Sequence, residues 1–234
     1  MYHSNSIIYT CLSLIVLSLS TAVLAESNNP PSQQPSSNST GFKESAAETK
    51  LRLGHGDPVA GKAKAGMCTS CHGEDGNSAD PKTPKLAGQY GLYIEKQVHN
   101  YQTGLLSHQL MGTMAAMVSD ADLPDIAAYF ASQPMMKGER PSNNAIGKNL
   151  FENNDLPRMM VRCKNCHGDT GRGLHPGNPI FPVIGGQHKE FLLKQLLQFK
   201  EGVRNNSPGG VMNTTVHRLT DAELEALADY TSGL

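Results

Sequence analysis

The sequence predicts an all-α fold built from two tandem domains of similar size. Three observations carry this prediction. The motif Cys-x-x-Cys-His occurs twice, as Cys68–His72 and as Cys163–His167. The segments that follow the two motifs place apolar residues at helical spacing. No segment shows the regular alternation of apolar and polar residues that is typical of a set of strands.

The N-terminal segment, residues 1–25, has features of a secretory signal peptide. Ile7–Leu24 is apolar, contains Cys11, and leads to Val23-Leu24-Ala25, a small-residue pattern that signal peptidase cleaves. No Lys or Arg precedes the apolar run, so an uncleaved membrane anchor is the alternative. Either way the rest of the chain is exported. We therefore expect a bacterial periplasmic protein, soluble or loosely associated with the membrane.

The next segment, residues 26–54, is rich in Ser, Asn, Pro and Gln over most of its length. Such a composition buries too little apolar surface to offset the entropy lost on ordering. We expect a flexible polar tail.

The rest of the chain is an internal repeat, with a first domain at 55–133, a linker at 134–146 and a second domain at 147–234. Each repeat opens on Gly-Lys, at Gly61 and Gly147, and continues through its Cys-x-x-Cys-His motif. A Pro-containing loop and an amphipathic helix follow, and then a closing helix after a capping box, at Ser119–Asp122 and Thr220–Glu223.

The two Cys-x-x-Cys-His motifs predict covalent attachment of two c-type haems. On a helical turn the two thiols of a motif lie on one face, where both can add to the vinyl groups of one porphyrin. The following His then reaches the iron as an axial ligand. A zinc site or a redox dithiol explains the pattern less well, because the motifs lie 95 residues apart and each carries a His. The predicted attachment residues are Cys68, Cys71, Cys163 and Cys166, and the predicted axial histidines are His72 and His167.

Methionine is the expected ligand on the other side of each iron, because His/Met ligation suits electron transfer. In the second domain Met212 precedes the capping box by eight residues, and the same spacing in the first domain selects Met111. Core packing is the preferred role of Met114 and Met117. His108 and His217 are the alternative ligands.

Pro84 and Pro182 follow their axial histidines by 12 and 15 residues. A carbonyl oxygen near each proline could accept a hydrogen bond from the second ring nitrogen of the histidine and so fix the ring. A plain turn is the alternative explanation for each proline.

The charge balance argues against nucleic acid as a partner. The chain has 20 Lys and Arg against 21 Asp and Glu, a formal net charge of −1. Nucleic-acid binding requires an excess of basic residues to neutralise phosphates.

With these motifs in place, residues 57–234 resemble the dihaem cytochrome c4 family. The resemblance is carried by Cys68–Gly73, Pro84–Gln89, Met111, Ser119–Asp122 and Ile126–Phe130, and by Cys163–Gly168, Phe181–His188 and Met212. It implies two class I cytochrome c domains, each wrapped around one haem, with propionate edges near the domain interface. It also implies His/Met ligation, with His72 oriented by the Pro84 carbonyl and His167 by that of Pro182. The chain departs from the family pattern at Val183, where Lys is usual, and in its N-terminal extension.

The resemblance further implies a carrier of single electrons in a respiratory chain rather than an enzyme. Expected partners are redox proteins that dock transiently, such as a cytochrome bc-type donor or a dehydrogenase, and a terminal oxidase as acceptor. An uncleaved N-terminal segment would add membrane association. One alternative is an electron-accepting subunit of a dehydrogenase, for example of the flavin-linked sulfide type. A dihaem peroxidase is a further alternative, and it would need an open iron position.

Overall fold

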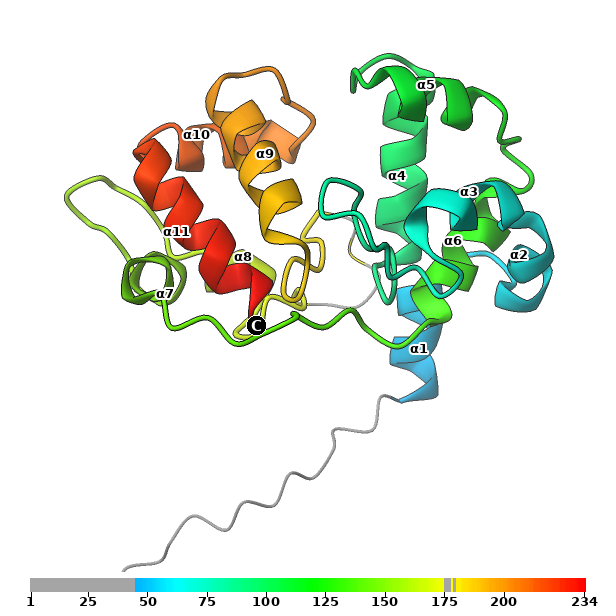
Figure 1. Ribbon diagram of the computed structural model, residues 1–234, viewed down its shortest axis with the longest axis horizontal. Helices are drawn as coiled ribbons and strands as arrows, with labels where there is room; N and C mark the ends of the chain where they lie inside the picture. Colours follow the sequence, from blue (N-terminus) through cyan, green and yellow to red (C-terminus); the bar gives the residue numbers. More distant parts are fainter. Residues whose placement is uncertain (1–44, 175–177, 179) are drawn as a thin grey trace, which may run out of the picture. The chain divides into compact units, whose positions relative to one another are not determined.

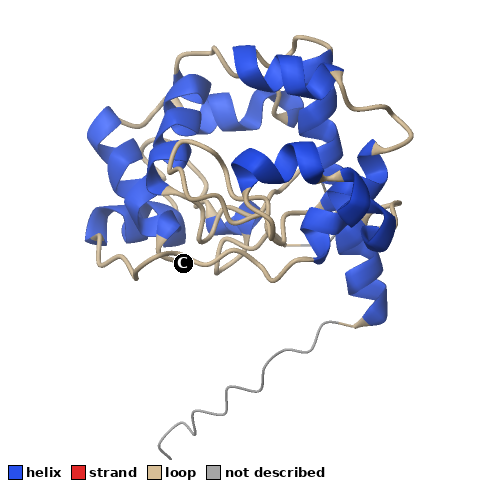
Figure 2. Cartoon of the chain, turned by 45° about the vertical axis from the view of Figure 1, so that its right-hand side comes forward, coloured by secondary structure: helices blue, strands red, loops and turns tan. Residues whose placement is uncertain are grey.

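A computed structural model describes residues 45–174, 178 and 180–234 of the chain. This part consists of helices and connecting loops, and no strand is formed in it (Figure 2). Its isolated β-bridge joins Asp155 to Met160. The predicted all-α class is confirmed. No helix in the described ranges has the length and apolar character needed to cross a membrane.

The helices of the first domain come before those of the second along the chain, and the colours of Figure 1 follow this order from blue to red. The first domain comprises α1 (Ala46–Leu53), α2 (Pro58–Lys64), α3 (Gly66–His72), α4 (Gly91–Gln102), α5 (Gln109–Ala116) and α6 (Leu123–Ser132). The second comprises α7 (Ala145–Glu152), α8 (Lys164–His167), α9 (Lys189–Lys200), the 3-10 turn η1 (Pro208–Gly210), α10 (Val211–Val216) and α11 (Asp221–Ser232). All the described residues belong to one compact unit.

In each domain a glycine allows two helices to pack closely. α2 contacts α6 at Gly61, where a Cβ atom would lie 1.9 Å from the carbonyl oxygen of Asp125. α7 contacts α11 at Gly147, where a Cβ atom would lie 2.1 Å from the carbonyl oxygen of Ala226. No side chain fits in either gap, so both positions require glycine. The Gly-Lys pairs that open the two sequence repeats therefore mark equivalent helix contacts.

Each domain has its own apolar core, and a smaller cluster joins the two. Phe130 is fully buried in the first-domain core, and Phe151 and Leu224 are fully buried in the second. Tyr90 of the first domain and Val183 of the second belong to the joining cluster and are 2 % exposed. The contact between the domains is therefore part of the packed interior.

The polar tail predicted for residues 26–54 is wrong for residues 46–53, which form α1. Ser45 and Glu48 make a capping box: the Ser45 Oγ accepts from the Glu48 N–H, and the Ser45 N–H donates to Glu48. Helix α1 then packs against α4 and α6. No residue of α1 is buried, so the capping box and these contacts together hold the helix. Residues 26–44, and the predicted leader 1–25, lie outside the described residues.

Two predicted boundaries also shift. Ser119 and Asp122 do bond to each other, with the Asp122 N–H donating to the Ser119 Oγ at 3.1 Å, but α6 begins only at Leu123. Pro124 has no N–H and interrupts the helical ladder before that point. The predicted linker 134–146 ends early, because Asn144 caps α7 and α7 starts at Ala145. The capping box at Thr220 and Glu223 is confirmed.

Candidate haem-binding sites

The first Cys-x-x-Cys-His motif lies in α3, which ends at its histidine. Gly73 stops the helix with a φ of 85°, a conformation that favours glycine. His72 is buried, Cys68 is half-buried and Cys71 is exposed. All three side chains line one cavity. The motif thus presents two thiols and an imidazole to a single space.

The second motif repeats this arrangement around α8. Cys163 is the N-cap residue of the helix, and Gly168, with a φ of 77°, ends it directly after His167. Cys163, Cys166 and His167 line the same cavity as the first motif. Burial raises the pKa of the Cys163 thiol to about 12, so the thiol is protonated at neutral pH. None of the four motif cysteines forms a disulfide among the described residues, so their sulfur atoms are available for attachment.

A backbone carbonyl holds each motif histidine. Nδ1 of His72 lies 2.8 Å from the carbonyl oxygen of Pro84, and Nδ1 of His167 lies 3.1 Å from that of Pro182. A carbonyl can only accept, so Nδ1 carries the proton and Nε2 keeps a free lone pair. Burial lowers the pKa of both histidines, although the bond to each carbonyl opposes this shift. Each ring is therefore a neutral, oriented donor to a metal.

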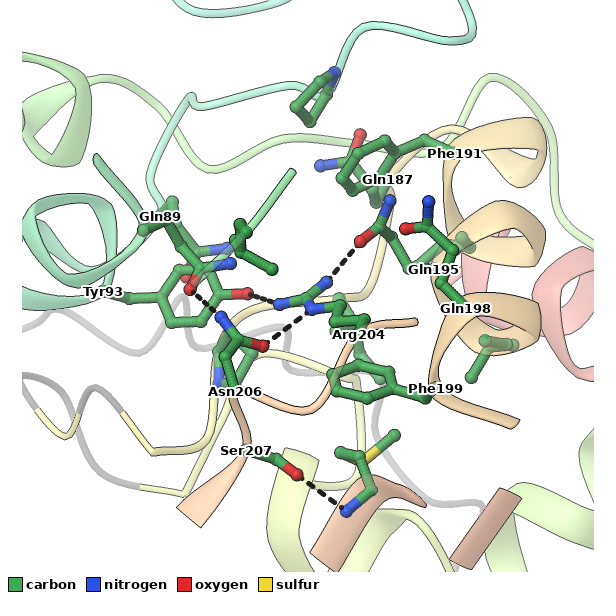
Figure 3. A pocket seen from close by; sticks show the side chains of 18 of the residues that line it. Gln89, Tyr93, Gln187, Phe191, Gln195, Gln198, Phe199, Arg204, Asn206 and Ser207 are labelled. Atoms are coloured by element: carbon green, nitrogen blue, oxygen red, sulfur yellow. Dashed lines mark hydrogen bonds between the residues drawn. The ribbon is translucent and has the colours of Figure 1, made fainter. Parts of the chain in front are cut away.

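The cavity has a volume of about 770 Å³ and takes its lining from both domains. Near the domain contact it holds a group of polar side chains, Tyr93, Lys96, Arg204 and Asn206, which we call the Arg204 cluster. Figure 3 shows Tyr93, Arg204 and Asn206 of this cluster. Arg204 is 7 % exposed. Its Nε donates to the Asn206 side chain at 2.9 Å and its Nη2 to the Tyr93 hydroxyl at 3.1 Å.

The Arg204 cluster has two cations and no carboxylate. Lys96 donates to the backbone carbonyl of Asn206 at 2.9 Å, and Arg204 also donates to the Gln195 side chain. Neither cation forms an ion pair in the described part of the chain. Burial, and secondarily the charge of Arg204, lowers the pKa of Lys96. Arg204 is buried and Lys96 is half-buried, so holding both without a counter-charge is costly, and an anion in the cavity would stabilise them.

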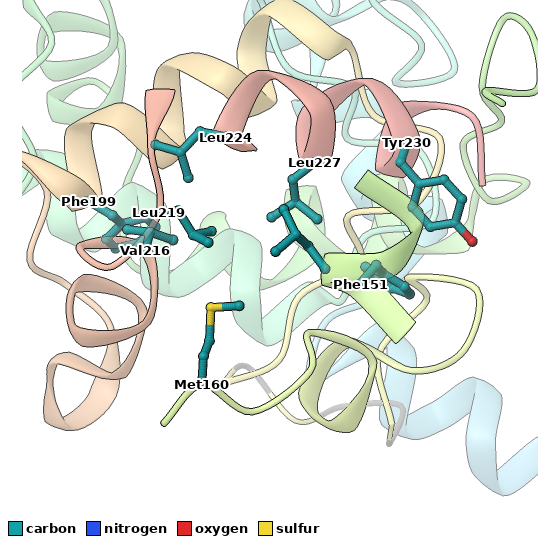
Figure 4. Packing of buried hydrophobic residues seen from close by; sticks show 9 residues of the cluster. Phe151, Met160, Phe199, Val216, Leu219, Leu224, Leu227 and Tyr230 are labelled. Carbon is teal, nitrogen blue, oxygen red and sulfur yellow. The ribbon is translucent and has the colours of Figure 1, made fainter. Parts of the chain in front are cut away.

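The cavity also contains the methionines that the sequence put forward. Met111 and Met114 lie on α5, are half-buried and line the cavity, whereas Met117 is 58 % exposed and does not line it. Met212 lies on α10, lines the cavity and packs against the second-domain core, to which Val216 and Phe199 belong (Figure 4). Both motif histidines therefore share one cavity with Met111, Met114 and Met212. The lining of this cavity also includes Met67, Met159 and Met160.

The alternative histidine ligands are placed differently. Nδ1 of His108 accepts the Met111 N–H at 3.3 Å and caps α5, although the residue lines the cavity. His217 is exposed and lies outside the cavity lining. Neither offers the buried, carbonyl-held geometry of the two motif histidines.

These residues fit haem c. The thiol pairs suit thioether attachment, the imidazole and thioether groups suit iron, and the apolar walls suit a porphyrin. The unpaired cations of the Arg204 cluster suit the carboxylates that a haem carries. The sequence motifs did not reveal this cluster. Comparing the two repeats could have drawn attention to Arg204, because it occupies the position of the apolar Leu106. The structure shows that the two positions are equivalent: both backbone N–H groups make the same bond at 2.9 Å, to the carbonyls of Gln198 and Asn100.

Comparison with known proteins agrees with this geometry. The Cytochrome c family matches residues 58–134 and 145–234. Cytochrome c4 from Pseudomonas aeruginosa is 40 % identical over 188 residues, which cover 80 % of this chain and 92 % of that protein. The chain belongs to the cytochrome c4 family. The matched cytochrome c domains imply covalently bound haem c and redox proteins as partners.

A solved cytochrome c4 also shares this fold. The crystal structure of reduced recombinant cytochrome c4 from Pseudomonas stutzeri gives a TM-score of 0.71 at 38 % identity, covering 76 % of this chain and 99 % of that one. A more distant relative is the thiosulfate dehydrogenase electron acceptor of Stutzerimonas stutzeri, 30 % identical over 168 residues, which cover 70 % of this chain and 76 % of that protein. The chain is thus a cytochrome c4-type electron carrier.

Proposed function

We propose that the chain is an exported dihaem cytochrome that carries single electrons between redox proteins and catalyses no reaction of its own. The observation that carries the proposal is the duplicated arrangement of a motif histidine bonded to a proline carbonyl at one shared cavity. Each bound haem would supply a one-electron iron(II)/iron(III) couple.

The chain's own residues would hold two haems. Cys68 and Cys71 would attach the first, and His72 and Met111 would be its axial ligands. In the second domain, Cys163 and Cys166 would attach the other haem, with His167 and Met212 as ligands. Pro84 and Pro182 would orient the histidines, and Lys96 and Arg204 would face haem carboxylates. The axial positions would all be filled by protein, so no iron site would be left open for a substrate.

A redox titration of the purified protein, followed by optical spectra, tests this proposal. We expect two haems per chain and, in the ferric protein, an Fe–S(Met) absorption band at about 695 nm. Met212→Ala should remove about half of that band, since one of two such ligands is lost. A single haem, or a ferric spectrum without the band, would refute the proposal.

Matched variants of α5 decide the first-domain ligand. Met111→Ala should remove the other half of the band, whereas Met114→Ala and Met117→Ala should leave it intact. If Met114→Ala removes the band and Met111→Ala does not, the ligand is Met114, which lines the same cavity.

The similarity to a thiosulfate dehydrogenase electron acceptor favours a second candidate, an electron-accepting subunit of a dehydrogenase. Such a subunit would co-purify with its enzyme from the native organism, whereas a free carrier would elute alone. Fractionation of the exported proteins would make this distinction and would also test the expected periplasmic location.

A further inference from the structure

Two peptide groups in the structure are hydrogen-bonded at both ends. The carbonyl of the Pro84–Lys85 peptide accepts from His72, and the N–H of the same peptide donates to Oε1 of Gln187 at 2.9 Å. The Pro182–Val183 peptide repeats this pattern: its carbonyl accepts from His167, and its N–H donates to Oε1 of Gln89 at 3.0 Å. Each glutamine belongs to the opposite domain from the histidine.

Both glutamines are fixed by more than this bond. Nε2 of Gln187 donates to the Lys85 carbonyl at 2.9 Å, and Nε2 of Gln89 donates to the Val183 carbonyl at 2.8 Å. Each Oε1 also accepts the backbone N–H of the residue after its glutamine, at 3.0 and 3.1 Å. Gln89 and Gln187 are 5 % and 4 % exposed. A carboxamide supplies the donor and the acceptor that these sites need.

We propose that Gln89 and Gln187 are positioning residues for the axial histidine of the opposite domain, so that each domain adjusts the reduction potential of the other domain's haem. This inference rests on the proposed function. A peptide whose N–H donates to a buried acceptor is more polarised, and its carbonyl becomes a stronger acceptor. A stronger bond at Nδ1 makes the imidazole more basic. A more basic ligand favours ferric iron and lowers the reduction potential.

The direction of the effect follows from this chain of bonds. Without Gln187, the Pro84–Lys85 peptide loses its polarising partner, and the first-domain haem becomes easier to reduce. Without Gln89, the same change occurs in the second domain. A general loosening of the domain contact would instead shift the potentials of both haems alike. A shift confined to the haem of the opposite domain therefore distinguishes adjustment of the reduction potential from a general loosening of the domain contact.

The test measures both midpoint potentials of the holoprotein by spectroelectrochemistry. The haems are distinguished by the NMR signals of their axial-methionine methyl groups, assigned with Met212→Ala. We expect Gln187→Met to raise the first-domain potential and leave the second unchanged, and Gln89→Met to do the reverse. Gln133→Met is the control, because this glutamine lies outside the cavity lining and its side chain donates within its own domain, to the Tyr129 carbonyl at 3.0 Å. It should move neither potential.

Shifts confined to the glutamine's own domain, equal shifts in both domains, or no shift would overturn the inference. If wild-type protein lacks two haems or the Fe–S(Met) band, the proposed function fails instead, and the inference with it. If a variant keeps both haems and the Fe–S(Met) band but the potential of the opposite domain's haem does not shift, the inference is refuted while the proposed function stands.

A measurement on the wild-type holoprotein does not depend on the variants' folding. The Lys85 and Val183 amides should exchange with deuterium far more slowly than the amide of Thr83, which bonds within its own loop to the Asp80 carbonyl at 3.0 Å. Lys85 and Val183 should also exchange at a common rate, because the same separation of the domains exposes both. Exchange of either amide as fast as that of Thr83 would overturn the inference.

Discussion

Arg204 is a deeply buried cation of the cavity, and its counterpart in the first repeat is Leu106. A buried cation stabilises the reduced form of a nearby redox centre, because reduction adds a negative charge. We therefore expect Arg204→Leu to lower at least one midpoint potential, and Arg204→Lys to retain most of the wild-type value. Spectroelectrochemistry of the holoproteins would measure both.

Lys62→Leu is the control for the loss of a charge, because Lys62 is exposed and its field is screened by water and salt. It should shift the potentials much less than Arg204→Leu. If Arg204→Leu and Lys62→Leu behave alike, the Arg204 cluster does not face a haem.

At the residue scale, the sequence was most informative where the chemistry is local. The cysteines and histidines of the two motifs are neighbours along the chain, so their spacing alone places them on one helical turn. The Arg204 cluster and the glutamine contacts join residues roughly a hundred positions apart. No pattern in one repeat can predict them, because they arise only when the two domains pack.

At the scale of the helices, glycines allow pairs of helices to pack closely. Gly147→Ala should destabilise the protein by about 1–3 kcal/mol, because the added methyl group overlaps the Ala226 carbonyl and forces α7 away from α11. Chemical unfolding of the holoprotein would measure this loss. Gly112→Ala in α5 is the control, since a Cβ atom at that position would meet no atom of another described element within 4 Å. Equal stability of Gly147→Ala and wild type would contradict the tight helix contact.

Asp125 ties α6 to α2 and makes this contact sensitive to pH. Its carboxylate accepts the Asp57 N–H at 2.8 Å and the Lys64 ammonium at 2.6 Å, and these bonds, the first above all, lower its pKa from 3.8. The folded state then binds a proton less readily than the unfolded state. The stabilisation is complete above pH 3.8 and is lost as the pH falls through the folded-state pKa.

Thermal unfolding over a series of pH values tests this linkage. The Tm difference between wild type and Asp125→Asn should be largest at neutral pH and should shrink in acid. A constant gap between wild type and Asp125→Asn would show that the carboxylate has the same pKa in both states.

At the scale of elements, apolar periodicity predicts the long helices α4 and α9 and the closing helices of both domains. Apolar periodicity does not predict helix α1, because this helix lies at the end of a long polar segment. Its sequence signal is the capping-box pair Ser45 and Glu48. The start of α6 lies later than its capping pattern predicts because Pro124 interrupts the ladder. The α6 difference concerns a helix end, where a single residue decides the outcome.

For the whole molecule, the interdomain bonds predict how the protein unfolds. The double variant Gln89→Met/Gln187→Met leaves the backbone N–H and carbonyl groups of Lys85 and Val183 without partners, each at a cost of about 1–3 kcal/mol. We expect urea to unfold wild-type holoprotein in one transition and the double variant in two. Circular dichroism and haem absorbance would follow the change. A single, merely earlier transition in the double variant would show that other contacts couple the domains.

The two-domain organisation itself was predictable from the repeat, whereas the contact between the repeats was not. That contact has a consequence for how the chain can vary. Gln89 and Gln187 bind main-chain atoms, so the side chains at their targets are free to differ, as Lys85 and Val183 do. Each domain carries both a glutamine and a backbone segment that the glutamine of the other domain binds. The contact is therefore self-complementary. Two identical halves could therefore associate by the same bonds, without a covalent linker between them.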